Sequence, residues 1–144
     1  MSIKRIVVGV DGSDNSRAAL KWAISEAAVH GAKLEVVHSW DIPVLFGTYS
    51  TPSAAYDPQT FEEAAQAVLD EVVASSDQHA LQQPIEKILA EGQAAAMILE
   101  TAKGADLLVV GQRGRGGFTG LLLGSISHQV VHHATCPVVV YPAE

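Results

Sequence analysis

The chain has 144 residues, of which 48% are hydrophobic and 17% are charged, and its formal net charge is −7. This size and composition are typical of one globular domain, residues 1–144, and the hydrophobic share excludes an intrinsically disordered protein. The acidic balance argues against a surface that coats nucleic acid, and no apolar run approaches the roughly 20 residues of a membrane-spanning helix.

The N-terminal part of the chain predicts a strand, a helix and a second strand. Ile3–Val10 is a β-branched run suited to a strand buried on both faces, and it is too short for the apolar part of a signal peptide. The polar turn that follows offers two helix caps, Ser13 and Asp14, and apolar residues then recur at helical spacing over residues 16–30. Lys33–Trp40 predicts the second strand and completes a βαβ unit.

The middle of the chain is less regular. Residues 41–58 show no period and predict a long loop, for which a lid over a ligand and a mobile connector are equally favoured. A second helix is predicted from Thr60 to Gln82, with Thr60 as its cap and Glu63 completing a capping box. Its expected apolar face contains Ala64, Ala67, Val68, Val72 and Ala74.

The C-terminal part adds the elements that define the fold class. Strands are predicted at residues 85–90, 105–110 and 137–141, and helices at residues 93–103 and 126–133. The first of these two helices is expected to face inward with Ala96, Met97, Leu99 and Ala102. Five strands alternating with four helices predict an α/β fold, a parallel sheet with helices on both faces. The single cysteine, Cys136, cannot form an internal disulfide, so we expect a soluble cytoplasmic protein without nucleic-acid or membrane partners.

A glycine-rich stretch, Gly111–Ser125, lies between the fourth predicted strand and the last helix. Glycine lets a ligand approach main-chain N–H groups, and a helix N-terminus adds unpaired donors, so this stretch suits a phosphate. The first strand ends in another polar turn, which begins at Asp11. If the first and fourth strands are neighbours where the strand order reverses, both sequences line one crevice.

The spacing within this stretch excludes two common phosphate-binding loops. A P-loop needs a Gly-Lys pair, and none occurs in the chain. The dinucleotide-binding pattern G-x-G-x-x-G also fails, since Gly114-x-Gly116 leads to Thr119. The spacing that is present is G-x2-G-x9-G-S, formed by Gly111, Gly114, Gly124 and Ser125.

With this motif the chain resembles the universal stress proteins, specifically their ATP-binding branch, which is marked by G-x2-G-x9-G-[ST]. The segments I-V-V-G-V-D-G-S, V-H-S-W and C-P-V-V-V also resemble the family and occur in the same order, so the resemblance covers essentially the whole chain. It implies a Rossmann-like fold, similar to the adenine nucleotide alpha hydrolases, with a five-stranded parallel sheet in the order 3-2-1-4-5.

The resemblance also implies a ligand, an adenine nucleotide across the C-terminal ends of the first and fourth strands. ATP is expected, with Mg2+ bridging its phosphate oxygens. The implied contacts are Gly9, Val10 and Asp11 at the adenosine, Ser39 at the adenine edge, Val110 and Gly111 at the ribose, and Gly114, Arg115, Gly124, Ser125, Ile126 and Ser127 at the phosphates. Two points stay open: Asp11 either contacts the ligand or caps a helix, and Arg113 and Arg115 either bind phosphate or are solvated.

Catalysis and metal binding have weaker support in the sequence. No nucleophile–base pattern occurs, and His128 and His132 lack the carboxylate of an H-E-x-x-H site, so neither catalytic nor metal-ligating residues are predicted. The resemblance implies a regulatory, nucleotide-binding module with unknown protein partners that forms a homodimer through the exposed strand Val138–Tyr141. A slow ATPase using the same site and a structural dimer with a vestigial pocket are the alternatives.

Overall fold

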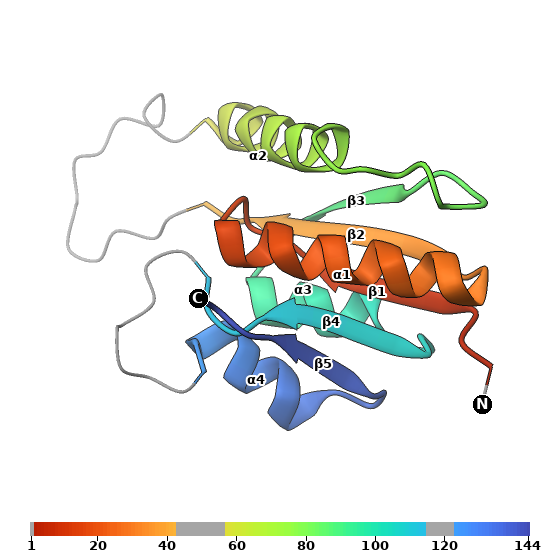
Figure 1. Cartoon of the computed structure of the whole chain (residues 1–144). Coiled ribbons are helices and arrows are strands. Elements are labelled where there is room, and N and C mark those ends of the chain that lie inside the picture. Colours follow the sequence, from red (N-terminus) through yellow and green to blue (C-terminus); the bar gives the residue numbers. More distant parts are fainter. Residues whose placement is uncertain (1, 43–56, 115–122) are drawn as a thin grey trace.

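Five parallel strands in the order β3-β2-β1-β4-β5 form the centre of the protein (Figure 1), the order that the resemblance implied. The structure is a computed structural model, which describes residues 2–42, 57–114 and 123–144. The strands are β1 (Arg5–Gly9), β2 (Lys33–Trp40), β3 (Glu86–Glu91), β4 (Leu107–Gly111) and β5 (Val138–Tyr141). The helices are α1 (Asp14–His30), α2 (Pro58–Ala74), α3 (Ala94–Thr101) and α4 (Ser125–His133).

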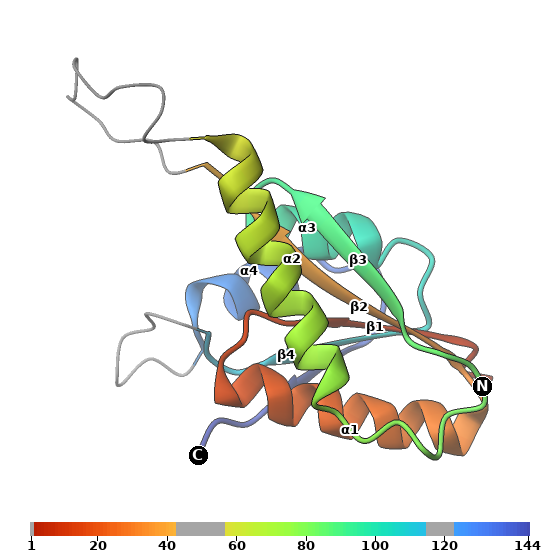
Figure 2. The same ribbon diagram turned by 90° about the horizontal axis from the view of Figure 1, so that it is seen from above.

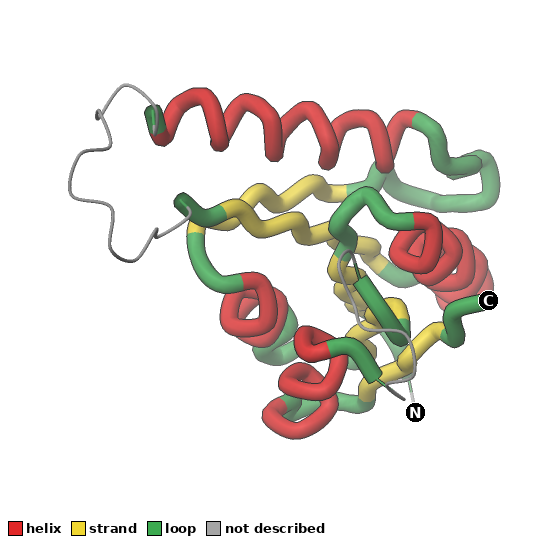
Figure 3. Tube along the Cα trace, turned by 90° about the vertical axis from the view of Figure 1, so that its left-hand side faces the viewer, coloured by secondary structure: helices red, strands yellow, loops and turns green. Residues whose placement is uncertain are grey.

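The sheet is covered on both faces, α1 and α2 lying on one side and α3 and α4 on the other (Figure 2, Figure 3). Alternate residues of a strand point to opposite faces, so β1 supplies both cores. Ile6 and Val8 pack in the cluster with α1 and α2, whereas Val7 packs in the cluster with α3 and α4. This two-sided burial explains the continuous β-branched run of β1.

The cap of α1 resolves one alternative left by the sequence. The Ser13 hydroxyl accepts a hydrogen bond from the Ser16 N–H, so Ser13 rather than Asp14 caps the helix. At the other end Gly31 adopts a left-handed φ of 65°, which lets the chain turn directly into β2.

The prediction for α2 was wrong at its start and its end, and its buried face was predicted correctly at Val72 and Val68 but not at the alanines. The helix begins at Pro58 and ends at Ala74, and the Asp57 carboxylate caps it by accepting from the Gln59 N–H, so Thr60 lies inside the first turn. Larger side chains set the phase, because they bury more apolar area than alanine. The inward residues are Ala65, Leu69, Val72 and Val73, while Ala64, Ala67 and Ala74 are exposed.

The phase of α3 also differs from the prediction, except at Ala102. The helix begins one residue after its cap, Gln93, and turns Ala95, Ile98 and Ala102 toward the sheet. Ala96 is exposed, and Met97 and Leu99 are only half-buried. Most of the long loop predicted at residues 41–58 lies outside the described residues. No helix in the described ranges is long and apolar enough to cross a membrane.

A buried carboxylate is neutralised near the amino ends of the strands. Glu35 is 4% exposed, and its carboxylate oxygens accept hydrogen bonds from Arg5 Nε and Nη2, each at 2.9 Å. The same guanidinium donates to the carbonyls of Thr101 and Lys103, which ties the end of α3 to the sheet. The hydrogen bonds from Arg5 hold the pKa of Glu35 below its usual value, against the opposing effect of burial.

Replacing Glu35 by alanine is expected to lower the free energy of unfolding by about 2 kcal/mol at neutral pH. This is less than the about 3–5 kcal/mol lost when a fully buried pair is broken, because the Arg5 side chain keeps 29% of its surface exposed. Glu71→Ala is the matched control, since Glu71 pairs with Arg17 but has a side chain that is 58% exposed. Its cost is expected to be clearly smaller than that of Glu35→Ala, because water screens an exposed pair.

The difference between wild type and Glu35→Ala is also expected to depend on pH. A folded-state pKa below the unfolded value means that the contribution of Glu35 is complete above the unfolded pKa of about 4.3 and is lost as the pH falls toward the folded pKa. Urea unfolding of both proteins across this range measures the change. A penalty that stays constant into acid would contradict the role assigned to the charged carboxylate.

Candidate functional site

Three strands of the sheet end beside one pocket. β1 lies between β2 and β4 and pairs with both in parallel, so all three end at the same edge of the sheet. The chain leaves β1 toward α1 on one face and leaves β4 toward α4 on the other, so the strand order reverses between them. Crevices at such a reversal are the usual ligand sites of open α/β sheets. The predicted adjacency of the first and fourth strands is confirmed.

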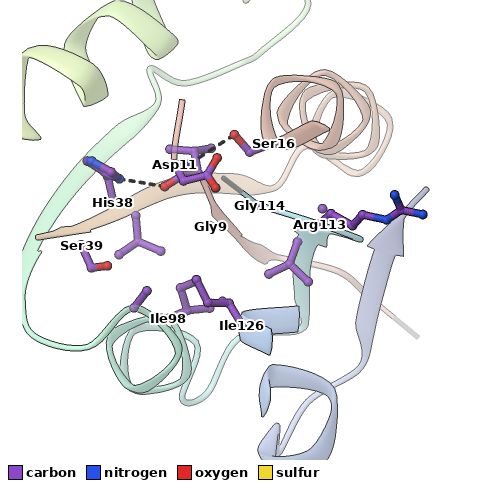
Figure 4. Close-up of a pocket in the computed structure, with 14 residues that line it drawn as sticks. Gly9, Asp11, Ser16, His38, Ser39, Ile98, Arg113, Gly114 and Ile126 are labelled. Atoms are coloured by element: carbon purple, nitrogen blue, oxygen red, sulfur yellow. Dashed lines mark hydrogen bonds between the residues drawn. The ribbon is translucent and has the colours of Figure 1, made fainter. Parts of the chain in front are cut away.

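Most of the residues predicted for the site line this pocket (Figure 4), namely Gly9, Val10, Asp11, Ser39, Val110, Gly111, Gly114 and Ile126. Gly124, Ser125 and Ser127 lie at the start of α4 and are not among the lining residues. Arg115 lies outside the described residues. The pocket is completed by Ser16, Val37, His38, Ala94, Ile98 and Arg113, most of which the sequence did not single out.

One side of the pocket is apolar and is formed where α3 packs closely on β1. A Cβ added at Gly9 would lie 2.7 Å from Ile98 Cδ1, so a side chain at this position would displace the Ile98 side chain. Figure 4 shows Ile98 and Ile126 together on one side of the pocket, with Asp11 on the opposite side. An apolar wall facing a few polar groups suits a ligand with a flat, largely apolar part and a charged part.

His38 joins the ends of β1 and β2 beside the pocket. Its ring Nδ1 lies 2.8 Å from the Val10 carbonyl oxygen, and since a carbonyl only accepts, Nδ1 carries the proton. The Val10 N–H in turn donates to the Val37 carbonyl at 3.0 Å. Sequence reasoning missed this role because the partner of His38 is a backbone atom of another strand, which no spacing reveals.

The Asp11 carboxylate shapes the turn that leads into α1 and also approaches the glycine-rich stretch. Asp11 Oδ1 accepts from the Ser13 N–H at 2.9 Å, and the Asp11 N–H donates to Ser16 Oγ at 3.2 Å. A Cβ added at Gly114 would lie 2.5 Å from Asp11 Oδ2, so the two strand ends meet here. Since Ser13 provides the cap, Asp11 is not the cap residue of α1.

The glycine-rich stretch is closed at its two described ends by the carbonyl of Gln112. This oxygen accepts from the Gly124 N–H at 2.8 Å and from Ser127 Oγ at 2.7 Å. The Ser127 hydroxyl therefore holds the two ends together, and Ser127 is 3% exposed. A Cβ added at Gly124 would lie 3.3 Å from Arg113 Cα, so a side chain here would require a small shift of the Arg113 backbone.

The start of α4 differs from the starts of the other helices. The caps of α1, α2 and α3 each accept a backbone N–H with a side chain, whereas the cap of α4 is Gly124, which has none. A helix N-terminus without a side-chain cap keeps donors and a partial positive charge for an anion. The start of α4 therefore connects the glycine-rich stretch to the pocket.

Arg113 contributes to the site through its backbone N–H rather than through its charged side chain. Its N–H donates to Asn15 Oδ1 at 2.8 Å, and its side chain points away from the centre of the pocket (Figure 4). The buried Nε has no hydrogen-bond partner among the described residues. The geometry thus gives no phosphate contact to the Arg113 guanidinium in this conformation.

The remaining candidates of the sequence lie away from the pocket. Burial raises the pKa of the Cys136 thiol, which opposes a reactive thiolate, and Cys136 precedes β5 at the amino edge of the sheet. The rings of His128 and His132 stack with centroids 6.2 Å apart. In the described ranges no group of three or more His, Cys, Asp or Glu is placed to hold a metal ion.

Comparisons with known proteins agree with this arrangement. The model of the Universal stress protein family matches residues 2–142. A universal stress protein of Mycolicibacterium smegmatis is 37% identical over 139 residues, which cover 94% of this chain and 44% of that protein. The chain thus spans less than half the length of the curated relatives that it matches.

Solved structures match the fold over its whole length. Universal stress protein UspA from Lactobacillus plantarum is 25% identical, with a TM-score of 0.69 over 98% of this chain and 99% of that one. A universal stress protein in complex with cAMP is 28% identical, with a TM-score of 0.73 over 99% of this chain and 98% of that one. The chain belongs to the universal stress protein family.

Proposed function

We propose that this chain binds ATP in the pocket between β1 and β4, and that its nucleotide state regulates association with protein partners. The observation that carries the proposal is the meeting of two separate sequences at this pocket, the turn at Asp11 and the glycine-rich stretch at Gly114. A relative of 28% identity was solved in complex with cAMP, which supports an adenine nucleotide here.

The two sides of the pocket suggest how the nucleotide lies. We assign the base and ribose to the apolar side, near Val10, Ser39 and Val110. The phosphates then lie toward Gly114 and the start of α4, where Ser125 offers a backbone donor and Gly124, whose own N–H donates to the Gln112 carbonyl, admits a close approach. Arg115 and Ser127 keep their assignments near the phosphates as predictions. Bound ATP would bring Mg2+, which would partly neutralise the phosphate charge.

Binding is favoured over hydrolysis because the sequence contains no nucleophile–base pattern at this site. A dedicated ATPase needs a residue that orients water at the γ-phosphate. Among the described lining residues, Asp11 and His38 are the groups that can accept a proton. Asp11 Oδ1 accepts from the Ser13 N–H, and His38 Nδ1 donates to the Val10 carbonyl, which leaves Nε2 of His38 as an acceptor. A slow ATPase remains the alternative for the same site.

Association is proposed to occur through β5, which is an edge strand of the described sheet. The carbonyls of Pro137 and Tyr141 accept from β4, so the N–H and C=O groups of Val138 and Val140 point outward by alternation. We propose that a second copy pairs with the segment Val138–Tyr141. A cytoplasmic location is part of the proposal and rests on the single cysteine, Cys136.

The double substitution Gly114→Ala, Gly124→Ala is expected to weaken ATP binding at least about tenfold. The new methyl groups would lie 2.5 Å from Asp11 Oδ2 and 3.3 Å from Arg113 Cα, so the Asp11 carboxylate and the Arg113 backbone must move, which disturbs the proposed phosphate site. Calorimetry measures the affinity, and circular dichroism checks the fold. Gly104→Ala is the control, because its φ of 78° costs stability at the amino end of β4, far from the pocket.

An unchanged affinity in the double variant would contradict the phosphate assignment. Nucleotide released by denaturing the wild type and separated by anion exchange distinguishes the two functions. Co-purified ATP supports binding, ADP supports hydrolysis, and the absence of any nucleotide together with no binding by calorimetry would rule out both.

Val140→Pro is expected to convert a homodimer into a monomer. The substitution removes an outward N–H from the edge and leaves the hydrogen bonds between β4 and β5 in place. Val140→Thr keeps both the N–H and the β-branch and serves as the control. Light scattering at micromolar concentration measures the mass, and a monomeric wild type would show that the edge does not pair.

A further inference from the structure

The described end of the glycine-rich stretch is bonded to the C-terminal tail of the chain. The Gln112 N–H donates to the Tyr141 carbonyl at 2.8 Å, and Gln112 Oε1 accepts from the Ala143 N–H at 2.9 Å. The carbonyl of the same residue accepts from Gly124 and Ser127 at the start of α4. One residue thus holds the start of the glycine-rich stretch, its end and the tail that follows β5.

Asn15, in the first turn of α1, makes a second connection between the same segments. Its Oδ1 accepts from the Arg113 N–H at 2.8 Å, and its Nδ2 donates to the carbonyls of Tyr141 and Pro142 at 3.2 and 3.3 Å. The orientation of the amide is fixed by its partners, since an N–H only donates and a carbonyl only accepts. In Figure 2 the first turn of α1 and the C-terminus lie at the same end of the molecule.

The contact between Asn15 and the stretch is close. A Cβ added at Gly111 would lie 2.7 Å from Asn15 Oδ1, so the amide rests directly on the end of β4. Gly111, Arg113 and Gly114 line the pocket, whereas Asn15 and the tail do not. The position of this pocket wall therefore depends on hydrogen bonds to residues that no ligand in the pocket would touch.

Helix α1 does not need the Asn15 amide for its own stability. Ser13 supplies the cap, and Ser16 Oγ donates to the Ser13 carbonyl within the same turn. Alanine is a better helix former than asparagine. Replacing Asn15 by alanine therefore removes the connection while leaving the helix with its cap.

We propose that Asn15 is a positioning residue that couples the nucleotide pocket to the end of the edge strand β5. The inference rests on the proposed function and adds its regulation. A nucleotide that restrains Gly111, Arg113 and Gly114 also restrains Tyr141–Ala143 through Asn15 and Gln112, and a tail held in place favours the bound form of the pocket by the same free energy. Nucleotide binding thereby affects the strand at which a second copy would pair.

The test compares wild type with Asn15→Ala in the full chain, using ATP as the ligand. Asn15→Ala is expected to weaken ATP binding about tenfold, measured by calorimetry. In wild type, ATP is expected to slow hydrogen exchange of the Arg113 and Ala143 amides, and in the variant the effect at Ala143 is lost. The Ala143 N–H bonds to Gln112 and not to Asn15, so its response reports the coupling rather than a deleted bond.

Gln78→Ala is the matched control. Gln78 also uses a side-chain amide to bond a backbone carbonyl, that of Val73, but it follows α2 and lies outside the pocket lining. It is expected to leave the affinity and both exchange rates unchanged, and thermal unfolding of both variants separates a loss of stability from a loss of coupling. The proposal would be overturned if Asn15→Ala bound ATP with wild-type affinity, or if bound ATP left the exchange rate of the Ala143 amide in wild type unchanged.

The same variants separate this inference from the proposed function. If the wild type binds no ATP, the proposed function fails, and the coupling is judged in the free protein. Faster exchange at Ala143 in Asn15→Ala than in wild type and Gln78→Ala then supports the connection between tail and pocket wall. Equal exchange in the three proteins would reject it as well.

Discussion

The parallel pairing of β1 with β4 is the constraint on which the site depends. Their register sets Val8 against Val109, so the two strands end together although most of the chain separates them. Because the chain then departs to opposite faces of the sheet, neither connection fills the space between the strand ends. The crevice is thus a result of topology, and the residues around it adjust its shape and charge.

That shape is set by close approaches, at which a side chain would keep two elements apart. Gly9 admits α3, Gly111 admits the first turn of α1, and Gly114 admits the Asp11 carboxylate. Three glycines therefore bring three different segments to one pocket. Polar contacts then fix the arrangement, largely through backbone groups such as the Val10 and Gln112 carbonyls.

Local signals made much of the fold predictable. The bounds of β2 and the candidate cap Ser13 followed from a β-branched run and a polar turn, and both are present in the structure. The start of α2 was missed although Asp57-Pro58 is a good signal, an acidic cap followed by proline in the first turn. The roles of His38 and Asn15 were not predictable in this way, because their partners are backbone atoms distant in sequence.

The all-parallel sheet also separates the two ends of the chain. The described chain starts at the amino edge of the sheet, close to the Arg5–Glu35 pair. Its last residues follow β5 at the carboxyl edge, beside the pocket (Figure 1). An affinity tag or fluorescent reporter attached after Glu144 would therefore be joined directly to the segment that holds the pocket wall. One attached ahead of Ser2 would be separated from the pocket by the full length of the strands.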